Sequence, residues 1–258
     1  IIDENSNSRP IAVMINNHNK ARLYHTGLQD AYVIYEMIVE GGLTRYMAIY
    51  KDMNTSKIGS VRSSRHNFLD YALEYDALYV HYGWSSRAQN DIKTLDINNI
   101  NGLYDDSAFV RDKSLNIASE HTAYTSMEKI KEVLNKKGYN ITTNQNSSVL
   151  NYSKDEISLK PKQITNSDGN KIDDPSSDSV MANKVLVPYS NYVTSSYEYD
   201  LEKKVYKRFV NGIAHNDYVT KDQYHFKNIV IMNVYNYTID SYGRQDLNTV
   251  GTGKGYYI

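Results

Sequence analysis

The chain of 258 residues contains no cysteine. This absence excludes disulfides, zinc–thiolate and iron–sulfur sites, and thiol nucleophiles. No run of 18 apolar residues occurs either, so we expect no membrane-spanning helix. A large excess of charge is also missing, because 29 basic and 30 acidic residues give a formal net charge of −1. A chain so close to neutral has no net field that draws it to nucleic acid, and we expect no nucleic-acid partner.

Familiar catalytic and cofactor motifs are absent as well. The sequence has no HExxH, no GxSxG, no Walker-type phosphate loop and no strand-linked GxGxxG. The seven histidines are scattered without ligand spacing, so we expect neither a metal nor a cofactor. The run Gly251-Thr252-Gly253-Lys254-Gly255 has the wrong glycine spacing for a phosphate loop, and we interpret it as a turn near a strand.

Tyrosine, in contrast, is abundant: 25 tyrosines occur beside four phenylalanines and one tryptophan. Tyrosine favours half-buried strands whose outer end stays wet, so much β-structure is expected. Residues 9–140 carry a dense apolar pattern, residues 141–183 form a polar linker or long loops, and residues 184–258 are rich in β-formers. The pattern predicts an α+β (mixed α/β) fold. A larger N-terminal α/β domain has a mixed sheet with flanking helices, and a smaller C-terminal domain is mainly β.

Within the N-terminal region, Gly41-Gly42 separates two runs of strand-forming residues and suits a tight hairpin turn. With these glycines at the centre of the turn, Ile38 faces Arg45, and Glu36, Glu40 and Arg45 share one face. That group is either part of a ligand site or a cross-strand ion pair on a solvated surface. A glycosidase pair of Glu36 and Glu40 fits poorly, because a spacing of four puts their Cα atoms roughly 13 Å apart.

A second group of basic residues lies at the expected start of a helix. Ser63 or Ser64 can cap a helix that runs to about Glu74, and Arg62 and Arg65 flank this cap. A helix N-terminus carries partial positive charge and free N–H groups, so these residues suit an anionic ligand. Two arginines near a helix cap also occur by chance.

The segment 77–82 alternates as a strand and ends at a glycine turn beside the only tryptophan. His81 therefore lies at the carboxyl end of a strand, with Trp84 next to it. In α/β folds, ligands commonly bind where strand ends meet helix starts. A structural histidine is the alternative for His81.

Thr125-Ser126-Met127-Glu128 forms a capping box in which Thr125 caps a helix that ends at Gly138. Just upstream, Arg111, Asp112 and His121 lie in loop-like sequence. We include these three residues among the candidates for ligand binding.

In the C-terminal region, Asn211-Gly212 is a strong signal for a two-residue hairpin. Counting outward from that turn pairs Arg208 with His215 and Tyr206 with Asp217, all on one face. This patch binds either a ligand or another domain, unless it is an ordinary polar sheet face.

Several ordered blocks resemble the YerB-like family, a domain of unknown function (3048) found in Gram-positive cell-envelope lipoproteins. The blocks of the N-terminal domain are residues 9–17, 35–45, 58–65, 74–77, 80–83 and 109–112. Those of the separate C-terminal domain are residues 206–212, His215, Asp217, residues 227–230 and 249–255. The resemblance extends from Arg9 nearly to the end of the chain.

The resemblance implies an extracytoplasmic protein that is lipid-anchored to the outer face of the cell membrane. The anchor would be an N-terminal cysteine upstream of Ile1, and the membrane is contacted only through it. No established reaction comes with the resemblance. The sequence departs from the family at Glu120-His121-Thr122, where relatives tend to have Pro-His-Asn, which argues against a catalytic use of His121.

Two functions follow from these observations. The first is a binding module for a polar or anionic envelope ligand or a cell-wall protein, with arginines that hold acidic groups and Trp84 as a stacking face. The alternative is a hydrolase or transferase acting on envelope polymers, with His81 as the general base or acid. Either function requires these residues to converge on a shared hollow.

Overall fold

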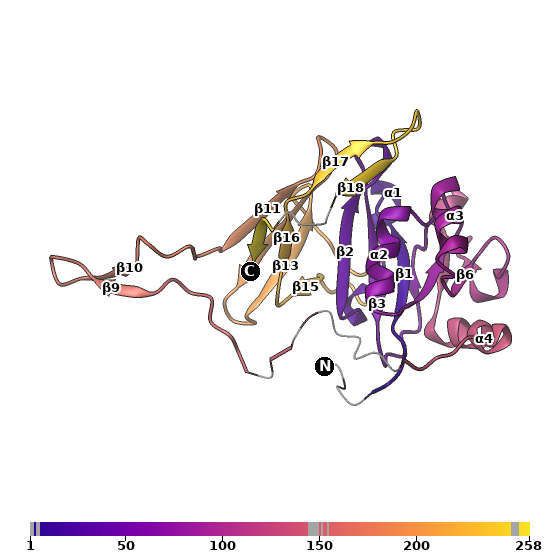
Figure 1. The fold of residues 1–258 in the computed structure, drawn as a ribbon, viewed down its shortest axis with the longest axis horizontal. Coiled ribbons are helices and arrows are strands. Elements are labelled where there is room, and N and C mark those ends of the chain that lie inside the picture. Colours follow the sequence, from indigo (N-terminus) through magenta and orange to yellow (C-terminus); the bar gives the residue numbers. More distant parts are fainter. Residues whose placement is uncertain (1–2, 4–5, 144–149, 151, 154, 249–252) are drawn as a thin grey trace.

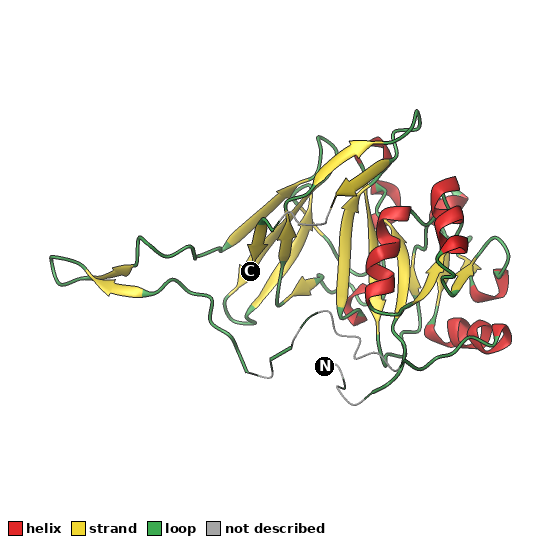
Figure 2. Cartoon of the chain, in the orientation of Figure 1, coloured by secondary structure: helices red, strands yellow, loops and turns green. Residues whose placement is uncertain are grey.

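The computed structural model describes the whole chain except residues 1–2, 4–5, 144–149, 151, 154 and 249–252. Two sheets pack side by side, and the helices lie around the N-terminal sheet (Figures 1 and 2). The predicted α+β fold is confirmed, with a mainly-β C-terminal region. Among the described residues, no helix combines the length and the apolar character needed to cross a bilayer.

The N-terminal sheet has five strands in the order β2-β3-β1-β5-β6. Its strands are β1 (Ile11–Asn16), β2 (Val33–Ile38), β3 (Thr44–Tyr50), β5 (Leu78–His81) and β6 (Asn99–Asn101). The central strand β1 is antiparallel to β3 and parallel to β5, so the sheet is mixed. All six residues of β1 are buried, as their apolar run predicts.

Short helices and a small second sheet surround these strands. The α-helices are α1 (Asn19–Arg22), α2 (Leu69–Glu74), α3 (Ser86–Thr94) and α4 (Met127–Lys137). The 3-10 helices are η1 (Leu28–Asp30), η2 (Glu40–Gly42), η3 (His66–Phe68), η4 (Asp106–Ala108) and η5 (Ser119–His121). The small sheet, in the order β4-β8-β7, contains β4 (Ile58–Gly59), β7 (Val110–Arg111) and β8 (Ala123–Thr125).

The two faces of the central sheet have different covers. On one face, Met14 and Met47 pack with Phe68 and Ile92 from the η3–α2 and α3 region. On the other face, strand residues pack partly against α4 and partly against Tyr224 and Phe226 of the C-terminal region. The C-terminal region is therefore part of the cover of the central sheet.

The C-terminal region is built on a second sheet, in the order β11-β12-β13-β14, with β15 beside β13. These strands are β11 (Lys184–Pro188), β12 (Thr194–Asp200), β13 (Val205–Val210), β14 (Ile213–Ala214) and β15 (His225–Phe226). Two further strand pairs follow: β16 (Val230–Met232) with β19 (Gly255–Tyr257), and β17 (Tyr235–Thr238) with β18 (Gln245–Asn248). The β17–β18 hairpin lies beside strand β2 of the first sheet and beside helix α2 (Figure 1).

Residues predicted to form a polar linker contain a small hairpin. Strands β9 (Gln163–Thr165) and β10 (Lys171–Asp173) pair with each other and project away from the rest of the molecule (Figure 1). Part of that segment, and residues 251–252 of the glycine-rich run near the C-terminus, lie outside the described residues.

The register of both predicted hairpins needs correction. The Gly41-Gly42 connection is one 3-10 turn, so Ile38 pairs with Thr44 and Arg45 pairs with Met37. Because a shift of one residue exchanges the faces of a strand, Glu36 and Arg45 lie on opposite faces. The Asn211-Gly212 hairpin has the predicted register only for its first residues, because Tyr206 pairs with Phe226 and not with Asp217.

The helix predictions also shift by one or a few residues. The predicted cap at Ser63 or Ser64 is wrong: η3 begins at His66, and Ser64 instead bonds Tyr79 at 2.9 Å. Helix α4 ends at Gly138 as predicted, but its cap is Ser126, whose hydroxyl accepts from the Lys129 N–H. Thr125 belongs to strand β8, and its hydroxyl donates to the Ala108 carbonyl.

Candidate functional site

The candidate site forms where a short segment enters the gap between the carboxyl ends of β1 and β5. The Asn16 N–H donates to the Ser60 carbonyl, and the Arg62 N–H donates to the Met14 carbonyl, both at 2.9 Å. On the other side, the Tyr82 N–H donates to the Arg62 carbonyl at 3.0 Å. Residues 60–64 thus act as an extra strand between two parallel strands. Ligands of α/β folds commonly bind at this edge of a sheet.

Two arginines share one carboxylate at this edge. Arg65 donates two hydrogen bonds to Glu40, one of them from Nε to Oε2 at 2.8 Å. Arg45, which is buried, contacts Glu40 Oε1 at 3.4 Å and donates to the Ser63 carbonyl at 2.6 Å. Burial raises the pKa of the Glu40 carboxyl, but the hydrogen bond from Arg65 and the two positive charges outweigh it and lower that pKa to about 2.

A third arginine lies next to this pair with a weaker partner. Arg62 contacts the Glu120 carboxylate at 3.3 Å, and the Glu120 side chain is 56% exposed. Arg62 also donates to the Glu120 carbonyl at 3.2 Å. Because Glu120 is so exposed, an incoming anion can displace it from Arg62 at little cost. We call Glu40, Arg45, Arg62, Arg65, Glu120 and Arg111 the edge cluster.

Arg111 joins the edge cluster through the loop that carries Glu120. Its guanidinium donates to the Ser119 carbonyl and lies 4.5 Å from the centre of the Tyr82 ring. Its neighbour Asp112 points elsewhere: it accepts from Lys57 at 2.9 Å, and Ser114 and Lys57 lower the pKa of its carboxyl. Asp112 is therefore removed from the candidate site.

Two histidines and an asparagine lie beside the edge cluster. His121 stacks on His18 with ring centres 4.7 Å apart, and its Nδ1 is 2.8 Å from the Asn16 side-chain nitrogen. Burial and the neighbouring His18 lower the pKa of His121, so its neutral ring can accept a hydrogen bond at Nδ1 from the Asn16 amide. The sequence analysis missed Asn16 and His18, although a polar run directly after a buried strand is a usable signal.

His81 has a structural role. Its ring is completely buried, with Nδ1 at 2.7 Å from the Gly83 carbonyl and Nε2 at 3.2 Å from the Asn99 side chain. Burial lowers the pKa of His81 to about 4, although both hydrogen bonds oppose this. The expectation that His81 faces a ligand is wrong, because its side chain has no exposed surface and its two ring nitrogens bond the Gly83 carbonyl and the Asn99 side chain.

Ser63 and Trp84 lie behind the edge cluster. The Ser63 hydroxyl donates to the Tyr82 carbonyl at 3.0 Å, so only its carbonyl belongs to the arginine contacts. The half-buried Trp84 ring lies between His81 and Tyr104, with ring centres 5.5 and 5.8 Å away. Trp84 is therefore held by ring contacts on both sides. It lies near the edge cluster but is not one of its contact residues.

A second polar cluster lies between the two sheets, and we call it the seam: Glu36, Tyr46, Ser195, Tyr197 and Arg208. The Arg208 guanidinium contacts Glu36 at 2.8 Å, and each of these side chains is only 6% exposed. Arg208 also donates to Tyr46, Ser195 and Tyr197. A buried charge pair with this many partners satisfies its polar groups without a ligand.

A chain of hydrogen bonds runs from the seam to Asn16, which lies beside the edge cluster. The Arg208 Nε–H donates to His215 Nδ1 at 3.2 Å, which leaves the His215 Nε2–H to donate to His25 Nδ1 at 3.0 Å. The His25 Nε2–H then donates to the Asn16 carbonyl. This direction requires both rings to be neutral, and burial lowers the pKa of His25 to about 3.

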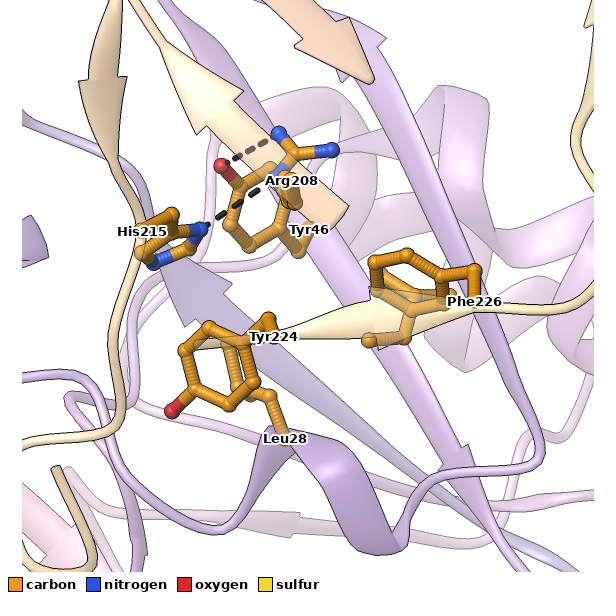
Figure 3. A pocket seen from close by; sticks show the side chains of 7 residues that line it. Leu28, Tyr46, Arg208, His215, Tyr224 and Phe226 are labelled. Carbon is orange, nitrogen blue, oxygen red and sulfur yellow. Dashed lines mark hydrogen bonds between the residues drawn. The ribbon is translucent and has the colours of Figure 1, made fainter. Parts of the chain in front are cut away.

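The predicted C-terminal patch therefore divides. Arg208 and His215 line a cavity of about 10 Å³ with Tyr46, Tyr224 and Phe226, which has room for about one water (Figure 3). Asp217 accepts from Thr26 and Gly27 of the N-terminal region, so it joins the two sheets. Tyr206 turns away and donates to the Ala182 carbonyl.

A larger cavity, of about 120 Å³, lies between η3, α3 and β18, and none of the predicted site residues lines it. Within the described parts of the chain, no three His, Asp or Glu side chains are grouped closely enough to hold a metal ion. The predicted residues therefore do not line a single hollow. Glu40, Arg45, Arg62, Arg65 and Arg111 belong to the edge cluster, and Arg208 of the C-terminal patch belongs to the seam.

Two family models match the chain. The N-terminal domain of a protein of unknown function (DUF3048) matches residues 1–140, and the C-terminal domain of the same family matches residues 185–258. The chain belongs to the DUF3048 family. The predicted resemblance to YerB-like proteins is confirmed.

A relative with similar sequence and structure comes from Bacillus subtilis. The chain is 33% identical over 252 residues to "Putative lipoprotein YerB" of Bacillus subtilis (strain 168), which covers 96% of this chain and 69% of that protein. The crystal structure of YerB protein from Bacillus subtilis matches with a TM-score of 0.80 and 29% identity. This match covers 97% of this chain and 78% of the YerB chain.

Proposed function

We propose that this DUF3048 protein is a binding module that holds an anionic group of a cell-envelope ligand, or of a cell-wall protein, at the edge cluster. A relative named as a lipoprotein supports a place outside the cytoplasm, lipid-anchored to the outer face of the membrane. The lipid anchor is then the only contact with the bilayer.

The observation that carries this proposal is an excess of positive charge. Arg45 and Arg65 contact Glu40, and Arg62 contacts Glu120. Arg111, which bonds the Ser119 carbonyl, adds a fourth positive charge, so the edge cluster has an excess of two. Burial, together with the charge of Arg65, lowers the pKa of Arg45 to about 9. A buried arginine that shares its only carboxylate gains stability from a further negative group.

The edge cluster also offers suitable hydrogen-bond geometry. Arginine guanidinium groups bind phosphate and carboxylate groups with two parallel hydrogen bonds. Arg62 is 28% exposed and is held mainly by the exposed Glu120, so it is free to turn towards a ligand. The neutral His18 and His121 rings beside it supply further polar partners.

The hydrolase or transferase hypothesis has little support from the site. It relied on His81 as general base, and that ring is buried and bonded to a carbonyl and an amide. A general base must reach the proton that it removes. We therefore keep the binding hypothesis alone.

The test is equilibrium binding of muropeptides, teichoic-acid fragments and nucleotides, measured by calorimetry and by Trp84 fluorescence. The expected result is saturable binding of at least one anionic ligand, weakened about tenfold or more in Arg62→Gln and weakened by added salt. Lys184→Gln is the matched control, since it removes an exposed charge paired with Glu198 on the other sheet. If none of the anions bound, or if Arg62→Gln and Lys184→Gln lost affinity equally, the proposal would be contradicted.

A further inference from the structure

The cavity of about 120 Å³ lies where the C-terminal hairpin crosses the helices of the N-terminal region. His66 and Asn67 line it from η3, Arg87 and Asp91 from α3, and Asp246 from β18. Residues far apart in the sequence thus build a single hollow, on the other side of the central sheet from the seam.

Buried polar groups without partners are concentrated here. Among the described residues, five buried side-chain polar atoms lack a hydrogen bond, and three of them belong to His66 and Asn67. Both residues are only 7% exposed. Buried polar groups in folded proteins are nearly always paired, so unpaired ones beside a hollow indicate a missing partner.

The chemistry of these groups defines that partner. Asp246 accepts from His66 Nε2 at 3.1 Å, so the His66 Nδ1 of the neutral ring is a free acceptor. The Asn67 amide offers one further acceptor and two donors. A ligand with several groups that both donate and accept, such as hydroxyls, satisfies this set.

The charge of the lining excludes an anion. Asp70, Asp91 and Asp246 face a single arginine, Arg87, which contacts Asp246 at 2.9 Å. The lining is therefore net negative, which is opposite to the edge cluster. A neutral or amine-bearing ligand fits this sign, and a phosphate or carboxylate does not.

Aromatic rings stand beside the cavity. The Tyr237 hydroxyl donates to Asp246 Oδ2 at 3.1 Å, and the Tyr235 ring stacks on Tyr237 with centres 5.9 Å apart. Tyr235 is 70% exposed. An exposed aromatic face beside carboxylate and amide groups suits a sugar ring, whose C–H bonds pack on the ring while its hydroxyls bind the polar groups.

We propose that the cavity between η3, α3 and β18 is a second site, which binds a neutral or amine-bearing sugar unit with Tyr235 and Tyr237 as its stacking surface. This site is separate from the edge cluster and does not depend on it. A single protein can then hold an anionic group at one place and a sugar at another.

The experiment titrates the full chain with glucose, glucosamine and glucuronate at millimolar concentrations and follows two-dimensional NMR spectra. Glucose, glucosamine or both should give saturable shifts at His66 and Asn67, glucuronate should not, and added phosphate should leave the binding unchanged. In Tyr235→Ala and Asp91→Asn, affinity should fall about tenfold. The control Tyr242→Ala removes a similarly exposed tyrosine of the same hairpin, whose ring packs on Arg244 and not on Tyr237.

A further variant separates binding from folding. Asn67→Leu replaces unpaired polar atoms by an apolar group of similar size, so it should abolish sugar binding and leave the melting temperature unchanged or raised. A lowered melting temperature would mean that Asn67 is needed for the fold, which contradicts the proposal. Absence of shifts with all three sugars, or binding retained in Tyr235→Ala and Asp91→Asn, would also overturn it.

Discussion

The seam and the edge cluster both place arginine on glutamate, but they differ in number and exposure. In the seam, one arginine and one glutamate are buried together with hydroxyl partners on both sheets. In the edge cluster, Arg45 and Arg65 share Glu40, whose side chain is 29% exposed. The balance of positive and negative charge and the burial of the side chains, and not the residue types, therefore separate a structural ion pair from a candidate ligand site.

The strongest test of this difference removes one member of the seam. Arg208→Met leaves the Glu36 carboxylate buried without its cation, so the free energy of unfolding should fall by about 3–5 kcal/mol. Urea unfolding followed by circular dichroism measures this loss. The double variant Glu36→Gln, Arg208→Met should recover part of it, and Lys184→Gln should change little. If Arg208→Met unfolds like the natural protein, the seam is not what joins the sheets.

Acid should destabilise the fold through the buried histidines next to the seam, His25 and His215. The pKa of His25 is about 3 in the folded protein and near 6.5 when unfolded, so the unfolded state binds protons first. Stability is therefore fully present above pH 6.5 and is lost as the pH falls towards 3. Between pH 7 and 5 this histidine should account for a loss of about 2 kcal/mol.

Urea unfolding of His25→Gln at both pH values checks this prediction, because the variant should lose that part of the pH dependence. His225→Gln, at a half-buried position on β15, is the control and should keep the full slope. Identical slopes for His25→Gln and the natural protein would contradict the assignment of a neutral His25.

The edge cluster, unlike the seam, should gain stability from an added anion. Glu40→Gln removes the carboxylate that Arg45 and Arg65 share, and should lower the free energy of unfolding by about 1–2 kcal/mol. Phosphate should then stabilise this variant more than the natural protein, because the ion replaces the missing charge. Melting temperatures in phosphate and in chloride of equal ionic strength measure the effect. Equal gains in both proteins would show that phosphate does not take the place of the Glu40 carboxylate.

The smallest effect on stability is expected for the exposed ion pair of the edge cluster, between Arg62 and Glu120. Arg62→Gln removes an ion pair whose acidic partner is 56% exposed, so the free energy of unfolding should change by less than about 1 kcal/mol. The same urea experiment measures it. A loss as large as that of Arg208→Met would make Arg62 a structural residue and would remove it from the proposed site.

Sequence patterns identified the fold and several local elements. The apolar run at β1, the end of α4 at Gly138 and the Asn211-Gly212 turn depend on near neighbours, so they were recoverable from spacing alone. An error of one residue at the Gly41-Gly42 turn had a larger effect, because it put Glu36 and Arg45 on the same face of the sheet, whereas they lie on opposite faces.

Long-range pairing was beyond these patterns. Nothing local links Glu36 to Arg208, or His66 to Asp246, because each pair meets only when the C-terminal region covers the central sheet. The sequence analysis expected Arg208 and His215 to bind either a ligand or another domain, and they contact the N-terminal region. Arg62 and Arg65 were found because they lie close together in the sequence.

The projecting β9–β10 hairpin has a consequence for the integrity of the chain. The polypeptide leaves the N-terminal region after α4 and enters the second sheet at β11. The contacts from Arg208 to Glu36 and from Asp217 to Thr26 join the N-terminal and C-terminal regions. A protease that cuts this excursion severs the backbone but none of those contacts. The two pieces would then migrate together as a native complex and separate only in denaturant.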